Sequence, residues 1–96
     1  HVDDVASGIL GVLGAAKGED VNICSGQPTA VRDVLRLIAR TIGREDLLAL
    51  GARPAPNWDP PFLCGDNARL RSYGWLPKFS LEAGIADAVG WWRQRI

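Results

Sequence analysis

The sequence has no excess of charge of either sign and no long hydrophobic run. Eleven Lys and Arg residues balance eleven Asp and Glu residues, so the net charge is zero. Nucleic-acid-binding domains carry basic patches and anionic membranes attract basic segments, so neither partner is expected. No apolar run approaches the roughly 18 residues of a transmembrane helix, and the first residues, His-Val-Asp-Asp, lack the basic region of a signal peptide. The sequence therefore predicts a cytoplasmic protein without nucleic-acid or membrane partners.

The sequence is also poor in side chains that carry catalysis. Its one histidine is His1, so a Ser/His/Asp triad is not expected, and no cluster has metal-ligand spacing. Neither a P-loop nor a glycine-rich dinucleotide fingerprint after a strand occurs, and Tyr73 and Lys78 have the wrong spacing for a Tyr-x-x-x-Lys pair. The carboxylates of Asp3 and Asp4 are adjacent in sequence, so they point to different faces and cannot share a proton. We therefore expect no catalytic residue and no metal site in this chain.

The length allows one small domain, which we place over residues 1–96. The apolar fraction of 47% is that of a globular protein and not of a disordered one. Cys24 and Cys64 have neither CxxC spacing nor a histidine beside them. Two buried, reduced thiols are the favoured interpretation, and a disulfide between them stays open.

Residues 3–16 have the pattern of a helix with two distinct faces. Asp3 or Asp4 can cap its start, and Lys17-Gly18 ends it. One face predicts a buried apolar stripe made of Val5, Ile9, Val12 or Leu13, and Ala16. A second face carries three glycines, each of which weakens a helix by up to about 1 kcal/mol relative to alanine: Gly8, Gly11 and Gly14. Either this glycine face lies against a close neighbour, such as a backbone or a sheet, or the glycines are merely tolerated.

A strand-loop-helix corner follows. Residues 20–24 predict a short strand, 25–29 a loop, and 30–42 a helix that Thr29 caps and Gly43 closes. The predicted buried face of that helix consists of Val31, Val34, Leu35, Ile38 and Ile42. In a chain with few reactive groups, this corner is where a ligand is best placed to meet the backbone.

The rest of the chain adds short elements and a final helix. Residues 62–64 predict a short strand, and 47–50 another, although four apolar residues do not separate strand from helix. Four prolines make 51–61 an extended loop. Asp66 caps a short helix, and residues 81–96 form a helix whose buried stripe is Leu81, Ile85, Val89, Trp92 and Ile96. The predicted fold class is α/β, a small α+β unit of three main helices with short strands.

Five short motifs follow one another along the chain. They are His1-Val2-Asp3-Asp4-Val5-Ala6, Asn22-Ile23-Cys24-Ser25-Gly26, Arg53-Pro54 before a proline-rich loop, Gly65-Asp66 with Gly74-Trp75-Leu76-Pro77, and Ser80-Leu81-Glu82-Ala83-Gly84-Ile85. Together they resemble the C-terminal third of the extended short-chain dehydrogenase/reductase family, the NAD-dependent nucleotide-sugar epimerases and dehydratases. Each motif alone is weakly specific, whereas five in order over essentially the whole chain are strongly so. The sequence departs from the family at Val21, where an aromatic residue is usual, and in a longer loop after Arg53.

The resemblance implies that the chain is the C-terminal substrate-binding lobe of a Rossmann-type protein whose Rossmann domain is absent. In that family the Rossmann domain binds NAD or NADP and carries the catalytic Tyr and Lys, so no cofactor is expected on this chain alone. Arg53 matches the family position that contacts the substrate diphosphate, and Asn22 lies where the family loop approaches the nucleotide. Gln27 and Trp58 border the same cleft. The implied substrate-binding residues are therefore Arg53, Asn22, Gln27 and Trp58.

The predicted function is the substrate-binding portion of an NAD(P)-dependent nucleotide-sugar epimerase, dehydratase or reductase, inactive as an isolated fragment. Its substrate is a GDP-, UDP- or dTDP-linked sugar, and the wording of the motifs leans toward the GDP-sugar enzymes. Two alternatives stay open: a free-standing nucleotide-sugar-binding module, and a non-catalytic interaction module. A fragment separated from its Rossmann domain should expose an apolar face and form a homo-oligomer or a swapped dimer.

Overall fold

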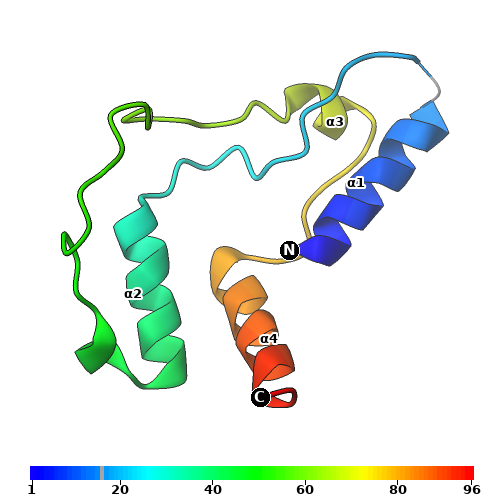
Figure 1. Cartoon of the computed structure of the whole chain (residues 1–96). Helices are drawn as coiled ribbons and strands as arrows, with labels where there is room; N and C mark the ends of the chain where they lie inside the picture. The colour runs from blue at the N-terminus through cyan, green and yellow to red at the C-terminus, as the bar shows by residue number, and fades with distance from the viewer. Residues whose placement is uncertain (16) are drawn as a thin grey trace. The chain divides into compact units, whose positions relative to one another are not determined.

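The computed structural model of the chain describes residues 1–15 and 17–96 (Figure 1). In this part of the chain lie four α-helices and one short 3-10 helix: α1 (Val2–Ala15), α2 (Val31–Ile42), η1 (Glu45–Leu47), α3 (Ala68–Ser72) and α4 (Leu81–Arg93). They fall into two compact units. The α1 unit comprises His1–Pro28 and Cys64–Ser80, and the α2 unit comprises Thr29–Leu63 and Leu81–Ile96. None of the described helices is long and apolar enough to cross a membrane.

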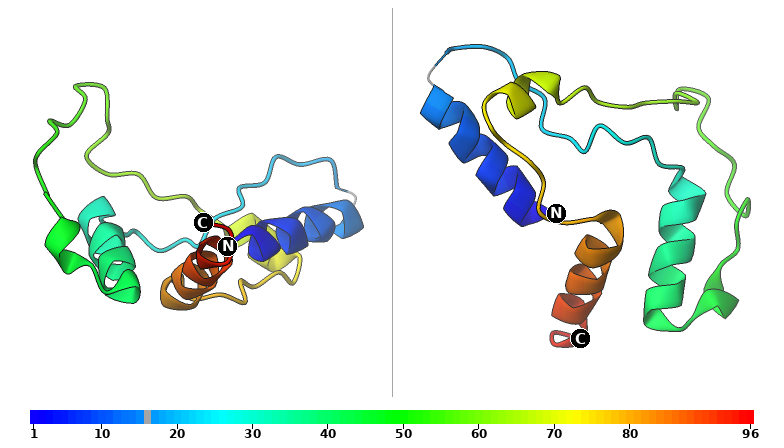
Figure 2. Two further views of the ribbon diagram at one scale, coloured as in Figure 1. Left: turned by 60° about the horizontal axis from the view of Figure 1, so that its bottom comes forward. Right: turned by 180° about the vertical axis from the view of Figure 1, so that it is seen from behind.

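The predicted α/β fold class is wrong, because the described residues form helices and no strand (Figures 1 and 2). Residues 20–24 and 62–64, both predicted as strands, have no regular secondary structure. The third candidate, 47–50, begins in the last residue of η1 and ends in a turn. A strand exists only as part of a ladder of backbone hydrogen bonds to a neighbouring strand. An apolar pattern identifies a segment suited to a ladder, but it does not supply the neighbour.

Side chains, not a ladder, hold the 20–24 segment in the α1 unit. Asn67 Nδ2 donates a hydrogen bond to the backbone oxygen of Cys24 at 3.0 Å. The guanidinium of Arg69 donates to the backbone oxygen of Asp20. Two carbonyl groups of the segment are therefore satisfied by the start of α3, which fixes the segment without making it a strand.

The glycine face of α1 packs against the rest of its unit. A Cβ added at Gly8 would lie 3.1 Å from Ile23 Cγ2 and 3.4 Å from Leu70 Cδ2, and Leu70 is fully buried. A Cβ at Gly11 would be in ordinary contact with Leu70, at 3.8 Å. At Gly14 nothing in the described chain comes within 4 Å. The close-neighbour alternative is thus confirmed at Gly8, whereas Gly14 is a tolerated glycine.

The predicted buried stripe of α1 is largely exposed instead. Val5 is 46% exposed, Ile9 49% and Leu13 70%, and only Val12 is half-buried. Ala16, the last predicted member, lies outside the described residues. Each residue turns a helix by about 100°, so the stripe and the glycine face lie on opposite sides. The periodicity identified one face of a helix correctly, but it did not show which face the chain itself covers.

In the α2 unit, α2 packs against α4 around Ala39, which is 4% exposed. The predicted end of α2 is confirmed, because Gly43 closes the helix with a left-handed φ of 73°. The predicted start is not, because Ala30 occupies the N-cap position that was assigned to Thr29. The predicted stripes of these two helices are only partly buried. Their exposed members are Val31, Leu35, Ile42, Leu81, Trp92 and Ile96.

Candidate functional site

In the corner that the sequence marked for ligand binding, residues 20–28 belong to the α1 unit, whereas the helix that follows belongs to the α2 unit. Ser25 Oγ accepts a hydrogen bond from the backbone N–H of Gln27 at 3.2 Å. Gly26 has a φ of 73°, and a Cβ there would lie 3.1 Å from Asn67 Oδ1. Both the left-handed backbone and this close approach require glycine at position 26. The loop is therefore specified by its own residues and by Asn67.

Sequence reasoning missed Asn67 as a residue of this site. The side chain is buried and its amide holds the backbone oxygen of Cys24. The N-cap position predicted for Asp66 is occupied by Asn67, although Asp66 Oδ1 accepts a hydrogen bond from the N–H of Ala68, the first residue of α3, at 2.9 Å. The sequence did contain a signal for Asn67. Asp66 and Asn67 are both residue types that cap helices, and one side chain is enough for the cap, so the amide of Asn67 is left for a distant partner.

A polar hollow of about 360 Å³ lies between the 20–24 segment and the start of α3, and is lined by Asp20, Asn22, Asp66, Ala68 and Arg69. Asn22 Nδ2 donates to the backbone oxygen of Asp66 at 3.4 Å. Arg69 donates to the backbone oxygen of Asp20, and its Nε lies 3.4 Å from Glu19 Oε2. The only guanidinium of the lining thus already faces protein acceptors. Two carboxylates against one cation make the hollow better suited to hydroxyl groups than to an anion.

Tyr73 lies near this charged cluster without the properties of a catalytic base. Its hydroxyl donates a hydrogen bond to Glu19 Oε2 at 2.7 Å. This bond to a carboxylate raises the pKa of Tyr73 above its ordinary value. A phenol that stays protonated is a donor, whereas a general base needs a pKa closer to neutrality.

The other predicted site residues are divided between the two units. Gln27 and Asn22 belong to the α1 unit, whereas Arg53 and Trp58 lie in the proline-rich loop of the α2 unit. Trp58 is 82% exposed. Arg53 is exposed too, and within the described residues it makes no hydrogen bond or ion pair. The guanidinium is therefore available to a ligand, and the joint action of all four residues stays a prediction.

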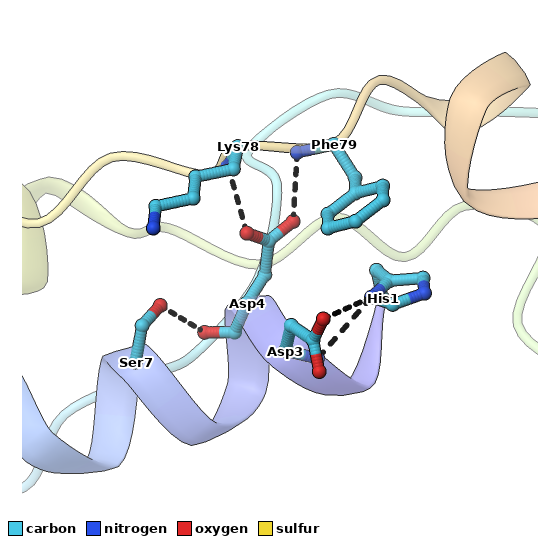
Figure 3. Close-up of polar contacts among 6 residues, drawn as sticks. All are labelled: His1, Asp3, Asp4, Ser7, Lys78 and Phe79. Carbon is cyan, nitrogen blue, oxygen red and sulfur yellow. Dashed lines mark hydrogen bonds and ion pairs between the residues drawn. The ribbon is translucent and has the colours of Figure 1, made fainter. Parts of the chain in front are cut away.

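The adjacent carboxylates point apart, as predicted (Figure 3). The carboxylate of Asp4 accepts hydrogen bonds from the backbone N–H groups of Lys78, at 2.7 Å, and Phe79, at 3.1 Å. The bond from Lys78 is the main cause that holds the pKa of Asp4 below its ordinary value. Asp3 is largely exposed and lies 3.8 Å from His1 Nδ1. The predicted capping role is wrong for Asp4, because its carboxylate satisfies the 78–79 backbone and not the start of α1.

The residues around Asp4 also anchor Trp75, which is 7% exposed. Its indole Nε1 donates to Ser7 Oγ at 3.0 Å and faces the backbone oxygen of Asp4 at 3.2 Å. Ser7 Oγ in turn donates to that oxygen at 3.0 Å (Figure 3). The Asp4 carboxylate and the Trp75 indole both join α1 to the segment before α4, so their role is structural.

The thiols and carboxylates of the described residues do not form a metal site: no group of three or more His, Cys, Asp or Glu side chains is placed to hold an ion. Cys24 and Cys64 are both free, so the interpretation of reduced thiols is confirmed over a disulfide. Cys24 is half-buried, but Cys64 is exposed, so burial of both thiols was wrongly predicted. An extended segment without a covering neighbour leaves the second thiol open to solvent.

The chain is similar over its whole length to one segment of several nucleotide-sugar enzymes. It is 34% identical over 97 residues to GDP-L-fucose synthase 1 of Arabidopsis thaliana, covering 100% of the chain and 29% of that protein. It is 29% identical over 101 residues to GDP-L-fucose synthase of Escherichia coli, covering 95% of the chain and 31% of that protein. It is 32% identical over 106 residues to dTDP-L-rhamnose 4-epimerase of Burkholderia thailandensis, covering 99% of the chain and 26% of that protein.

No protein-family model and no solved structure matches the chain. The chain spans less than a third of the length of these curated relatives. The resemblance seen in the motifs is thus confirmed at the level of a segment: the chain is related to part of the nucleotide-sugar enzymes of the NAD-dependent epimerase/dehydratase type.

Proposed function

We propose that the chain is the substrate-binding portion of an NAD(P)-dependent nucleotide-sugar epimerase, dehydratase or reductase, and that its substrate is a GDP-linked sugar. The observation that carries the proposal is the alignment of the entire chain, at 34% identity, with one segment of a GDP-L-fucose synthase. Matches to a dTDP-L-rhamnose 4-epimerase and, at 31% identity, a UDP-glucose 4-epimerase of Mycolicibacterium smegmatis support the wider class. They also keep dTDP- and UDP-linked sugars as the alternative substrates.

In this proposal the cofactor and the reacting side chains belong to a Rossmann domain elsewhere in a longer cytoplasmic parent protein. The residues of this chain do not fit NAD or NADP, because a dinucleotide site needs a strand, a glycine-rich turn and a helix in succession. Gly8, Gly11 and Gly14 lie inside α1, and the described residues supply no strand before a glycine-rich turn. The chain contributes substrate contacts, and we expect no turnover from it alone.

Arg53 is proposed to bind the diphosphate of the substrate. A guanidinium can meet a phosphate with two parallel hydrogen bonds, which a lysine ammonium does not reproduce. The exposure of Arg53 and its lack of partners in the described chain leave all of its donors open. Trp58, exposed on the same loop, offers a flat face on which a nucleobase can stack.

Asn22 is proposed to bind hydroxyl groups of the nucleotide-sugar from the polar hollow. Its side chain carries both donors and an acceptor, and it lines the hollow together with Asp20 and Asp66. Carboxylates accept hydrogen bonds from hydroxyl groups but repel phosphate, so the hollow is proposed to hold hydroxyl groups and not the diphosphate. Gln27, on the loop that follows Asn22, completes the proposed set.

A chimeric enzyme tests the proposal. The 97-residue segment of the Arabidopsis GDP-L-fucose synthase 1 that matches this chain is replaced by the chain, and formation of GDP-L-fucose is measured with the host's own substrates. We expect product, and we expect Arg53→Ala to raise KM at least tenfold while Arg32→Ala, a matched exposed arginine on α2, leaves it unchanged. A chimera that folds and binds the nicotinamide cofactor of the host but forms no product contradicts the proposal.

Calorimetric titration of the isolated chain separates the proposal from a free-standing binding module. The module would bind a GDP-, UDP- or dTDP-sugar at micromolar concentration without help. A portion that supplies only half of a site loses the contacts of the other half, so we expect no saturation below millimolar ligand. Tight binding by the chain alone would favour the module.

A further inference from the structure

The exposed side of α1 is an apolar face made of Val2, Val5, Ile9, Leu10 and Leu13. These side chains are between 46% and 75% exposed. The sequence from residue 5 to residue 16 contains no charged residue at all. A helix that faces water normally places charged and polar groups on its outer side. The apolar face of α1 therefore has the composition of an interface and not of a solvent-exposed surface.

This face is not an unused side of a poorly packed helix, because the opposite side is firmly engaged. Gly8 lies against Ile23 and Leu70, and the carboxylate of Asp4 is bound to the backbone N–H groups of Lys78 and Phe79. α1 is thus oriented by contacts within its own unit, and these contacts turn the apolar face outward. The orientation is built into the sequence, since glycine is the residue that permits the close approach at position 8.

The surface area of the chain supports a missing partner. The chain exposes 7687 Å² of accessible surface for a mass of 10.4 kDa. Even two separate compact proteins sharing that mass equally would together expose only about 6,500 Å². The excess of about 1,200 Å² lies within the range buried between two domains of one chain, about 600–1,500 Å².

We infer that the apolar face of α1 is the docking surface for the cofactor-binding domain of the parent protein. The inference rests on the proposed function, and the length of the relatives supports it: they are more than three times as long as this chain. A second copy of the chain fits less well. A stable interface between separate proteins uses about 20–30 residues a side, whereas this face supplies five. A domain in the same polypeptide needs less area, because its effective concentration is already high.

Hydroxyl-radical footprinting of the isolated chain and of the chimeric enzyme tests the inference. Leu10 and Leu13 are expected to be modified rapidly in the isolated chain and at least fivefold more slowly in the chimera. Trp75, buried in its own unit, is expected to be protected equally in both proteins. A double variant, Leu10→Glu with Leu13→Glu, should lower the melting temperature of the chimera, while Leu63→Glu, at an exposed position after the proline-rich loop, should not.

Equal modification of the two leucines in both proteins would overturn the inference. Protection that appears in the isolated chain as its concentration rises, with no further change in the chimera, would assign the face to a second copy instead. If the chimera does not fold, the isolated chain is footprinted with and without the separately produced host remainder; protection supports the inference and unchanged rates contradict it. If Leu10 and Leu13 are protected in the chimera but no GDP-L-fucose forms, the docking surface is supported and the proposed function is contradicted.

Discussion

The three glycines of α1 allow helix propensity and packing to be separated in one series of substitutions. Alanine adds a single methyl group and favours a helix by up to about 1 kcal/mol over glycine. At Gly14 nothing in the described chain comes within 4 Å of the added carbon, so Gly14→Ala should stabilise the chain by about 0.5–1 kcal/mol. At Gly11 the nearest atom would be 3.8 Å away, an ordinary contact, and Gly11→Ala should behave in the same way.

Gly8→Ala should have the opposite outcome. The added carbon would lie 3.1 and 3.3 Å from two carbons of Ile23, below the 3.5–4.0 Å of a favourable carbon contact. Leu70, at 3.4 Å, is fully buried, so a shift of its side chain would disturb the packing of its neighbours. Overpacking of this kind costs about 1–3 kcal/mol, which offsets or exceeds the gain in propensity. The net change at Gly8 should therefore lie about 1–3 kcal/mol below that at Gly14.

Urea unfolding followed by far-UV circular dichroism measures these differences. The free energy of unfolding is obtained by linear extrapolation, and equal slopes confirm that the variants unfold over the same change in surface. Ile23→Ala removes both close carbons, so Gly8→Ala should lose most of its cost in that background. If Gly8→Ala stabilises the chain as much as Gly14→Ala does, α1 does not pack through its glycine face.

Three further predictions concern the α1 unit. Gly65→Ala places a carbon 2.5 Å from Cys24 Sγ and 2.9 Å from Cys24 Cβ, so it should lower the urea midpoint, and Cys24→Gly should restore it. Because the pKa of Asp4 is lowered in the folded state, its contribution to stability is present above about pH 4 and is lost as the pH falls through the folded pKa. Asp4→Asn should remove that part of the pH dependence of the urea midpoint. Cys64, exposed, should react with a thiol reagent faster than the half-buried Cys24, and equal rates would contradict the exposures described.

The helices could be predicted from the sequence because helical hydrogen bonds connect neighbours along the chain. The expected helix at 30–42 is observed at Val31–Ile42, and the expected helix at 3–16 at Val2–Ala15. The strands could not, since strand formation depends on a partner that the sequence of one segment does not name. The 20–24 segment has the right residues for a strand, and side chains of the α3 region occupy its carbonyl groups instead.

The candidate site was predictable only in part. Asn22 lies in the lining of a hollow and Arg53 is exposed on its loop, and their substrate-binding roles stay predictions. Asn67 was missed because its role depends on a contact with Cys24, more than forty positions away in the sequence. Contacts of this kind have no local pattern, whereas the motif around Asn22 does.

Where the predicted burial of an apolar helix side chain was wrong, the side chain is more exposed than predicted. Many side chains predicted to be buried in the helices are exposed, while three apolar side chains form the whole buried core of the described residues: Ala39, Leu70 and Trp75. The five side chains of the apolar face of α1 together expose the equivalent of about three complete side chains, and covering them would contribute about 5–9 kcal/mol. That is comparable with the entire stability of an ordinary domain, about 5–15 kcal/mol. An apolar pattern this costly to leave in water describes a helix that is covered, so the sequence-based prediction of burial fits the proposed parent protein better than it fits the chain alone.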